Sequence, residues 1–259
     1  MPVAVDINSD VGESFGRWRL ADEEILPFVT SVNVACGMHA GDPVHMDEIV
    51  RKASNLSLDI GAHPGFPDLQ GFGRREMKFS PKEIEAYVLY QISALNGFVT
   101  SCGSRLTHVK PHGALYNMAV LDDKIARAVA TGAARAARHL VLVGPPGSSL
   151  MLAANAVGLP WVAEAFADRA YNSDGTLVSR ELPGSVIEDA DQAAARVLDI
   201  VRKGTIRSIE GKDVPISVHT ICVHGDTPGA VEMARRIRSK LEAAGVTLRP
   251  LHELAQPAG

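Results

Sequence analysis

The chain has 259 residues, 46% of them hydrophobic, and its formal net charge at pH 7 is -4. This length and composition allow a sizeable core, and the absence of a basic run argues against nucleic acid or an anionic membrane surface as a partner. No stretch reaches about 18 consecutive apolar residues, so the sequence predicts no ordinary membrane span.

The cysteines and the first residues both bear on the cellular compartment. Cys36, Cys102 and Cys222 are few and odd in number, which suits thiols in a reducing cytoplasm better than disulfides. The chain goes directly into a predicted strand at residue 3, without the layout of a signal peptide. We therefore expect a cytoplasmic protein. Because no linker of glycine, serine or proline divides the chain, we also expect a single domain over residues 1–259.

The first predicted strand spans residues 3–7 and the second residues 32–36, and a short helix between them begins at the acidic residues 22–24. Asp42 follows the second strand and is expected to cap a helix. Aspartate is a favourable N-cap, and the proline after it fits the first helical position. Apolar residues then recur at helical spacing, which indicates an amphipathic helix.

The third predicted strand covers residues 58–61, and a long loop rich in glycine and charge follows at 66–77. Long loops in compact domains are often lids or binding loops. Ser80 opens a capping box at the start of the next helix. The fourth strand is predicted at 106–109, and one alanine-rich helix is expected to continue to about residue 137.

The C-terminal half continues the alternation of strands and helices. Its predicted elements are strands at 140–143, 161–166 and 216–223, helices at 190–201 and up to about 244, an irregular segment at 171–184, and an eighth short strand or tail at 246–248. Several strands are unbroken apolar runs, which is typical of a parallel sheet covered on both faces. Seven such units favour a closed (β/α) barrel, with an open doubly wound sheet as the main alternative.

Ionisable or amide side chains lie at or just after most of the predicted strands. They are Asp6, Asn8, Asp10, His39, Asp42, His63, Lys110, His112, Asp168, Arg169, His224 and Asp226. In a barrel the carboxyl ends of the strands meet at one rim, so these groups are predicted to form one site. A single histidine at a strand end is often only structural, but four at four strand ends favour a functional role. Common phosphate-loop, dinucleotide, nucleophile-elbow and zinc-finger motifs are absent from the sequence.

Seven segments that carry these residues resemble the LamB/YcsF family. They are DINSDVGE (6–13), NVACGMHAGDP (33–43), GAHPGFPD (61–68), GFGRR (71–75), VKPHGALYN (109–117), EAFADR (164–169) and VHGDTP (223–228). They occur in order over nearly the whole chain, so the match is specific. One small departure is Ser9, where the family often has cysteine or alanine.

The resemblance implies both a fold and an activity. The implied fold is a distorted barrel of about seven parallel strands, similar to the glycoside hydrolase/deacetylase fold. The implied activity is that of a 5-oxoprolinase: ATP, with Mg²⁺, is hydrolysed to ADP and phosphate while 5-oxo-L-proline is opened to L-glutamate, together with two other subunits, B and C. The related deacetylases hold a divalent metal with an aspartate and two histidines, so Asp6 or Asp10 could bind a metal with His39 and His63.

These implications lead to hypotheses about individual residues. We expect the catalytic groups among His39, His63, His112, Lys110 and Asp10, with one of the histidines as general base. Substrate and phosphate groups are expected to contact Asn8, Arg74, Asp168, Arg169, His224 and Asp226, with arginine suited to carboxylate or phosphate. Two alternatives stay open: a metal-dependent amide or acyl hydrolase that needs no ATP, and a non-catalytic subunit that binds the lactam.

Overall fold

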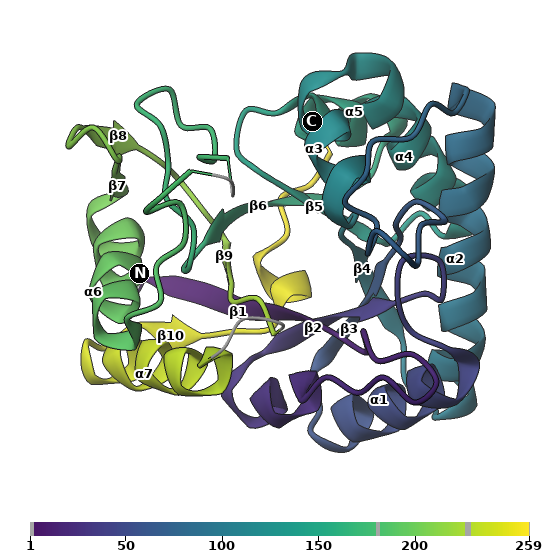
Figure 1. Cartoon of the computed structure of the whole chain (residues 1–259), viewed down its shortest axis with the longest axis horizontal. Helices are drawn as coiled ribbons and strands as arrows, with labels where there is room; N and C mark the ends of the chain where they lie inside the picture. Colours follow the sequence, from purple (N-terminus) through teal and green to yellow (C-terminus); the bar gives the residue numbers. More distant parts are fainter. Residues whose placement is uncertain (1–2, 180–181, 226–228, 259) are drawn as a thin grey trace.

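The computed structural model describes residues 3–179, 182–225 and 229–258. At its centre parallel strands close into a barrel, which Figure 1 shows with the helices around it. In order around the barrel the strands are β1 (Ala4–Val11), β2 (Ser31–Ala35), β3 (Asp59–His63), β4 (Leu106–Val109), β5 (Val141–Gly144), β6 (Trp161–Phe166) and β9 (Thr220–Cys222). Because β9 pairs with both β6 and β1, the sheet is closed. The predicted seven-stranded barrel is confirmed, and the open sheet is excluded.

Strand β1 is longer than the sequence predicted, and this difference decides where its polar residues lie. Its first half pairs with β9 and its second half with β2, so Asn8 and Asp10 are part of the strand rather than a tip after it. Side chains alternate between the two faces of a strand. Asp6, Asn8 and Asp10 therefore share one face, and the contacts of Asn8 with residues of β6 and β9 place this face inside the barrel.

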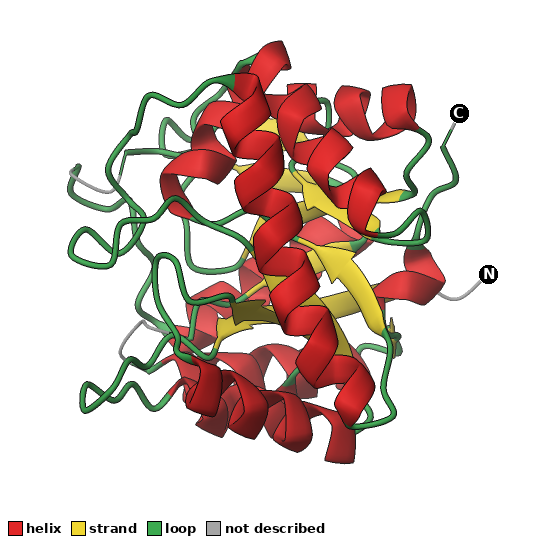
Figure 2. Cartoon of the chain, turned by 90° about the vertical axis from the view of Figure 1, so that its right-hand side faces the viewer, coloured by secondary structure: helices red, strands yellow, loops and turns green. Residues whose placement is uncertain are grey.

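The helices form an outer layer, and the long helix in front of the strands in Figure 2 is α2. The layer consists of η1 (Asp22–Phe28), α1 (Pro43–Asn55), α2 (Pro81–Ser101), α3 (Gly113–Leu121), α4 (Asp123–Ala136), α5 (Ser149–Val157), α6 (Ala190–Lys203) and α7 (Ala230–Ala243). The short η2 (Leu251–Leu254) instead contacts β1 and β4, two strands that are not neighbours in the barrel. The expected caps are present: the Asp42 side chain accepts from two backbone amides of α1, and Ser80 forms a capping box with Glu83. Burial of the apolar faces of these helices against the strands provides the core.

Several predicted elements differ from the structure. The alanine-rich helix is divided into α3 and α4 because Asp122 is extended and its carboxylate caps α4. Helix α5 was not predicted, since its short, mostly apolar sequence gives no clear polar face. The strand predicted at 216–223 is confined to β9, while β7 (Thr205–Arg207) and β8 (Asp213–Pro215) form an unpredicted antiparallel pair. The short strand at the end exists as β10 (Thr247–Leu248), beside the start of β1.

Among the helices formed by the described residues, none is both long enough and apolar enough to cross a bilayer.

Candidate active site

Polar side chains fill the barrel interior beneath the rim. The Asn8 amide donates to Glu164 Oε1 at 3.0 Å and to Thr220 Oγ1 at 2.7 Å. The Asn33 amide donates to Asn8 Oδ1 and to Asp10 Oδ1, both at 2.8 Å. Interior groups of this kind are tolerated because each finds a hydrogen-bond partner, and a satisfied network holds its members in one geometry. Asn8 therefore belongs to the hydrogen-bond network that lies beneath the rim.

The ammonium group of Lys110 lies inside this network. Its Nζ is 3.0 Å from Asp10 Oδ1, 2.9 Å from Glu164 Oε1 and 3.0 Å from Cys222 Sγ. Burial alone would lower the pKa of Lys110, but the carboxylates of Asp10 and Glu164 raise it well above the usual value. The charge of Lys110 therefore balances interior carboxylates, rather than standing at the rim as the sequence suggested.

Asp6 lies at the opposite end of the strand from the rim, away from the histidines with which it was grouped as a metal ligand. Its carboxylate accepts hydrogen bonds from Thr30 and Ser31, each at 2.6 Å, and from Thr220 at 2.5 Å. Burial raises its pKa to about 7. The structure does not bring Asp6 to His39 or His63.

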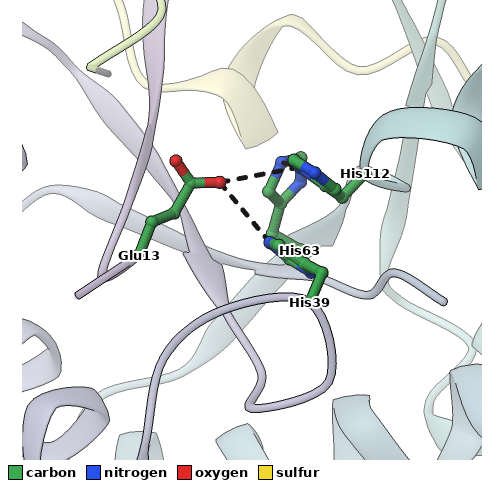
Figure 3. Close-up of side chains that lie close together, drawn as sticks. All are labelled: Glu13, His39, His63 and His112. Carbon is green, nitrogen blue, oxygen red and sulfur yellow. Dashed lines mark hydrogen bonds and ion pairs between the residues drawn. The ribbon is translucent and has the colours of Figure 1, made fainter. Parts of the chain in front are cut away.

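Four buried side chains meet at the rim, as Figure 3 shows: Glu13, His39, His63 and His112. They come from the ends of four successive strands of the barrel, β1 to β4. One potential ligand atom from each lies within 4.8 Å of the others. Glu13 Oε1 is 3.4 Å from His39 Nε2 and 3.6 Å from His112 Nδ1, and the His39 and His112 rings are stacked with centroids 3.7 Å apart. We call these four residues the rim cluster.

Two backbone carbonyls fix the protonation of the rings in the rim cluster. His63 Nδ1 is 2.7 Å from the Lys110 carbonyl oxygen, and His112 Nε2 is 2.8 Å from the Phe72 carbonyl oxygen. A carbonyl only accepts, so both of these nitrogens carry hydrogen. In the neutral rings the other nitrogens, His63 Nε2 and His112 Nδ1, face each other with lone pairs at 3.0 Å. Two lone pairs at this distance need a proton or a cation between them.

The remaining members of the rim cluster also suit a cation. Burial and then neighbouring His63 lower the pKa of His39 well below its usual value, so its ring is neutral near pH 7. Within the described part of the chain, neither ring nitrogen of His39 has a hydrogen-bond partner. Neutral imidazoles with a carboxylate are a common ligand set for divalent transition ions. The cluster could therefore hold a metal, through Glu13 and His112 rather than Asp6.

Asp10 connects the rim cluster to the interior network. Its Oδ2 is 3.3 Å from His63 Nε2, whereas its Oδ1 accepts from Lys110 and Asn33. Burial opposes ionisation, but the charge of His63 when its ring is protonated, together with that of Lys110, lowers the pKa of Asp10 well below its usual value. Asp10 is therefore a carboxylate that faces the histidines from below.

A histidine–aspartate pair lies on the other side of Asp10. His224 Nδ1 is 2.8 Å and 2.9 Å from the two carboxylate oxygens of Asp168, and the ring stacks on Phe166 with centroids 5.3 Å apart. Potential ligand atoms of Asp10, Cys222 and His224 lie within 4.8 Å of one another. Asp168 and His224 are thus close to the catalytic candidates, as the sequence predicted for this rim.

The arginines of the predicted substrate site lie in two different environments. Arg169 is buried, and its Nη2 donates to the Val178 carbonyl at 2.5 Å. Arg74 is exposed on the loop 66–77, with its guanidinium carbon 5.5 Å from the centre of the Phe72 ring. Phe72 in turn lies edge-on to His112, so this loop borders the rim cluster. The last predicted residue, Asp226, lies outside the described residues.

Sequence reasoning missed the roles of Glu13 and Glu164. Glu13 stands two residues after the true end of β1, where a carboxylate at a strand tip could have been noticed. Glu164 lies inside β6 with its carboxylate in the interior, and a strand pattern gives no sign that it meets Lys110. Both were contained in the motifs that carried the family resemblance.

Comparison with known proteins places the chain in a family. The model of the LamB/YcsF family matches residues 5–256. A relative from Pyrococcus furiosus, named as the A subunit of 5-oxoprolinase, is 52% identical over 248 residues, which cover 95% of this chain and 97% of the relative. The crystal structure of a lactam utilization protein from Thermus thermophilus has a TM-score of 0.91 and 47% identity, and the match covers 95% of this chain and 99% of that one.

A more distant structure shares the fold alone. The catalytic domain of a peptidoglycan N-acetylglucosamine deacetylase from Eubacterium rectale has a TM-score of 0.52 and 12% identity, over 100% of this chain and 92% of that one. The barrel is therefore of the kind found in deacetylases. On the family-model match and the identity to its relatives, the chain belongs to the LamB/YcsF family.

Proposed function

We propose that this chain is the A subunit of an ATP-dependent 5-oxoprolinase. With subunits B and C it opens the lactam of 5-oxo-L-proline to L-glutamate, while ATP, as its Mg²⁺ complex, is hydrolysed to ADP and phosphate. The names of the relatives support the substrate and the assembly. The observation that carries a catalytic role for this chain is the rim cluster, where His63 Nε2 and His112 Nδ1 face each other at 3.0 Å in a buried site.

We propose that His39, His63, His112 and Glu13 hold a divalent metal ion. When bound, such an ion polarises a carbonyl and makes water a better nucleophile at neutral pH. This assignment replaces Asp6 and adds Glu13 and His112, while Asp10 orients His63 from below. The carbonyls of Lys110 and Phe72 then act as the outer partners that set the orientation of the ligating rings.

The Asp168–His224 pair provides this chain's group for proton transfer. Donation from His224 Nδ1 to the carboxylate leaves Nε2 to accept or release a proton. Opening the lactam adds hydroxide to the carbonyl carbon and breaks the carbon–nitrogen bond, and the ring nitrogen must take up a proton. We propose that His224 carries that proton, which leaves the three rim-cluster histidines as ligands. Arg74 at the rim and Arg169 are proposed to attract the substrate carboxylate or phosphate charge.

Coupling to ATP explains why further subunits are needed. A lactam is a stable amide, and transfer of the terminal phosphoryl group of ATP to its oxygen releases ADP and makes the carbon a better electrophile. Addition of water and cleavage of the carbon–nitrogen bond then leave an acyl phosphate, and a second water molecule releases phosphate and L-glutamate. Such an intermediate must be kept from bulk water, and sites of this kind are commonly closed by a lid or by another subunit. The loop 66–77 borders the rim cluster and is suited to that closure.

A metal-dependent amide or acyl hydrolase is the second candidate. The buried cluster of histidines and a carboxylate on a barrel of the deacetylase kind favours it. This candidate differs from the first in one respect that is easy to measure, because it requires no ATP.

The decisive assay combines this chain with purified subunits B and C, 5-oxoproline, ATP and Mg²⁺. We expect glutamate and phosphate to be released together, and neither product when ATP or the lactam is omitted. Glutamate release without ATP would favour the simple hydrolase, and no release from the full mixture would contradict the proposal. Elemental analysis of the chain and of a His63→Ala/His112→Ala variant tests the metal separately: we expect a divalent ion in the first and its loss from the second.

A further inference from the structure

Two large aromatic side chains are exposed in the loop between β1 and η1. Phe15 is 42% and Trp18 is 54% exposed, although water around aromatic rings is unfavourable. The backbone amide of each residue donates to the carbonyl of the other at 2.9 Å, which forms a tight turn. The Gly16 amide also donates to Asp42 Oδ2 at 2.9 Å, so the turn is attached to the start of α1. These rings are therefore presented on a fixed support. We call residues 15–18 the rim turn.

The rim turn contacts the loop 66–77, which we call the active-site loop. The ring of Trp18 meets that of Phe72 edge-on, with centroids 6.1 Å apart. Phe72 lies edge-on to His39 at 5.9 Å and to His112 at 5.4 Å, and its carbonyl accepts the His112 Nε2 hydrogen. Phe72 also has a positive φ of 53°, which is uncommon for a bulky residue and marks a position held by its surroundings. One aromatic ring thus separates the exposed Trp18 from the rim cluster.

The surface around the rim turn is basic, although the net charge of the chain is -4. Arg17 is exposed, and across the ranges that the structure describes it takes part in no ion pair. Arg19 Nη1 lies 3.3 Å from the ring of His45 rather than beside a carboxylate. Arg74 covers the Phe72 ring from the active-site loop. The surface that surrounds Trp18 therefore complements an acidic partner.

This combination of groups is characteristic of a protein interface. Tryptophan, phenylalanine and arginine are enriched at protein interfaces, and tryptophan and arginine are also enriched among the residues that dominate binding energy. The exposed apolar groups extend over two loops, since Leu69 on the active-site loop is 43% exposed as well. A surface of this width suits a protein segment better than a small molecule, which binds in an enclosed concave site.

We propose that the rim turn and Phe72 form the docking surface for the pair of subunits B and C, through an acidic segment that carries an apolar anchor. This inference rests on the proposed function, which supplies the partners. A segment seated on Trp18 also covers Phe72, whose ring packs edge-on against the buried His39 and His112. Binding of the pair would therefore place the partner directly beside the rim cluster.

The test measures the dissociation constant between this chain and the purified B–C pair by calorimetry. Phe15→Ala/Trp18→Ala is expected to weaken binding by about tenfold or more. Arg17→Glu is expected to weaken it and to reduce its dependence on salt. The matched control is Tyr90→Ala on α2, which removes an aromatic ring that is 59% exposed. It is expected to bind as the unaltered chain does.

A second measurement guards against a misfolded variant. Hydrogen exchange of the unaltered chain should show residues 15–19 and 69–75 becoming protected when the B–C pair is added. Equal dissociation constants for the unaltered chain and both variants, or protection confined to other segments, would overturn the docking surface. Failure of the unaltered chain to bind the pair at all would instead overturn the proposed function on which the inference rests.

Discussion

Two buried ionisable residues of the barrel interior have opposite surroundings. Lys110 is charged and is balanced by Asp10 and Glu164 within 3.0 Å. Asp6 has only hydroxyl groups as its hydrogen-bonding partners among the described side chains, and burial raises its pKa to about 7. An ionised group without a nearby opposite charge is costly in the interior. The two residues should therefore respond differently to pH.

Asp6 should make the stability of the folded chain depend on pH. Its pKa is about 7 in the folded state and 3.8 for an ordinary exposed aspartate, so between these values the folded state holds a proton that the unfolded state has lost. The stabilisation that Asp6 provides through this proton is fully present below pH 3.8 and is lost as the pH rises through 7. The free energy of unfolding falls by at most about 4 kcal/mol over this range.

The measurement is urea denaturation of the unaltered chain and of Asp6→Asn at several pH values. The side chain introduced by Asp6→Asn cannot ionise. The free energy of unfolding of this variant should therefore rise relative to that of the unaltered chain between pH 5 and pH 8. The matched control is Thr30→Val, which removes one hydroxyl partner but keeps the Asp6 carboxyl, so the dependence on pH is expected to remain. A difference between Asp6→Asn and the unaltered chain that is independent of pH would contradict the raised pKa.

The rim histidines should be required for turnover and dispensable for the fold. His39→Ala or His63→Ala should lower glutamate release by the complete complex by ~10²-fold or more, as expected for a lost ligand or proton-transfer group. Circular dichroism should show an intact fold in both variants. His139→Ala, which removes a histidine on the outside of the barrel beside α2, is the control. Normal activity in both rim variants would refute a catalytic role for the cluster.

At the scale of elements, the rim cluster depends on close approach by the loop 66–77. Gly73 has a φ of +65°, and a Cβ there would lie 2.7 Å from the Cβ of His39 and 2.8 Å from His112 Cδ2. The loop also contacts the start of α3, where the Ala114 amide donates to the Gly73 carbonyl at 2.9 Å. Glycine thus lets the loop lie against both rings, which a larger residue would displace.

Gly73→Ala should therefore disturb the proposed metal site more than it disturbs the barrel. We expect the affinity for a divalent ion to fall about tenfold, because the two rings proposed as ligands, His39 and His112, change position. Titration with zinc, followed by calorimetry, measures this. Gly103→Ala is the control, since Gly103 also has a positive φ but no atom within 4 Å of the position that a Cβ would take. Equal zinc affinity in both variants would argue against the packing role of Gly73.

At the scale of the whole molecule, the rim has exposed aromatic and basic groups directly beside a buried cluster. An activated intermediate must be kept from bulk water, and we propose that partners bound to these exposed groups complete the enclosure of the site. We therefore predict that the chain alone, with 5-oxoproline, ATP and Mg²⁺, forms little or no glutamate, and that addition of subunits B and C restores turnover. The assay is glutamate release with and without the pair. Full turnover by the isolated chain would refute the dependence on partners.

Patterns in the sequence were enough to predict alternating strands and helices and the edge of the sheet at which the site lies. Apolar runs alternating with helical patterns specified parallel strands, and short-range signals such as Asp42 and Ser80 fixed where helices begin. These features depend on residues close together in the chain, so a local pattern suffices. The histidines at strand ends likewise indicated the rim, because parallel strands bring their carboxyl ends together.

Which of these polar residues contact one another depends on the tertiary structure. Closure of β9 onto β1 and the extension of β1 placed Asn8 and Asp10 inside the barrel, and Lys110 turned inward to the carboxylates of Asp10 and Glu164. Asp6 shares a strand face with Asp10, yet it lies nearer the start of β1 and meets hydroxyl groups instead of histidines. Glu13, two residues beyond the end of β1, belongs to the cluster through its contacts with His39 and His112. Such contacts depend on distances between residues far apart in the chain, which no local pattern records.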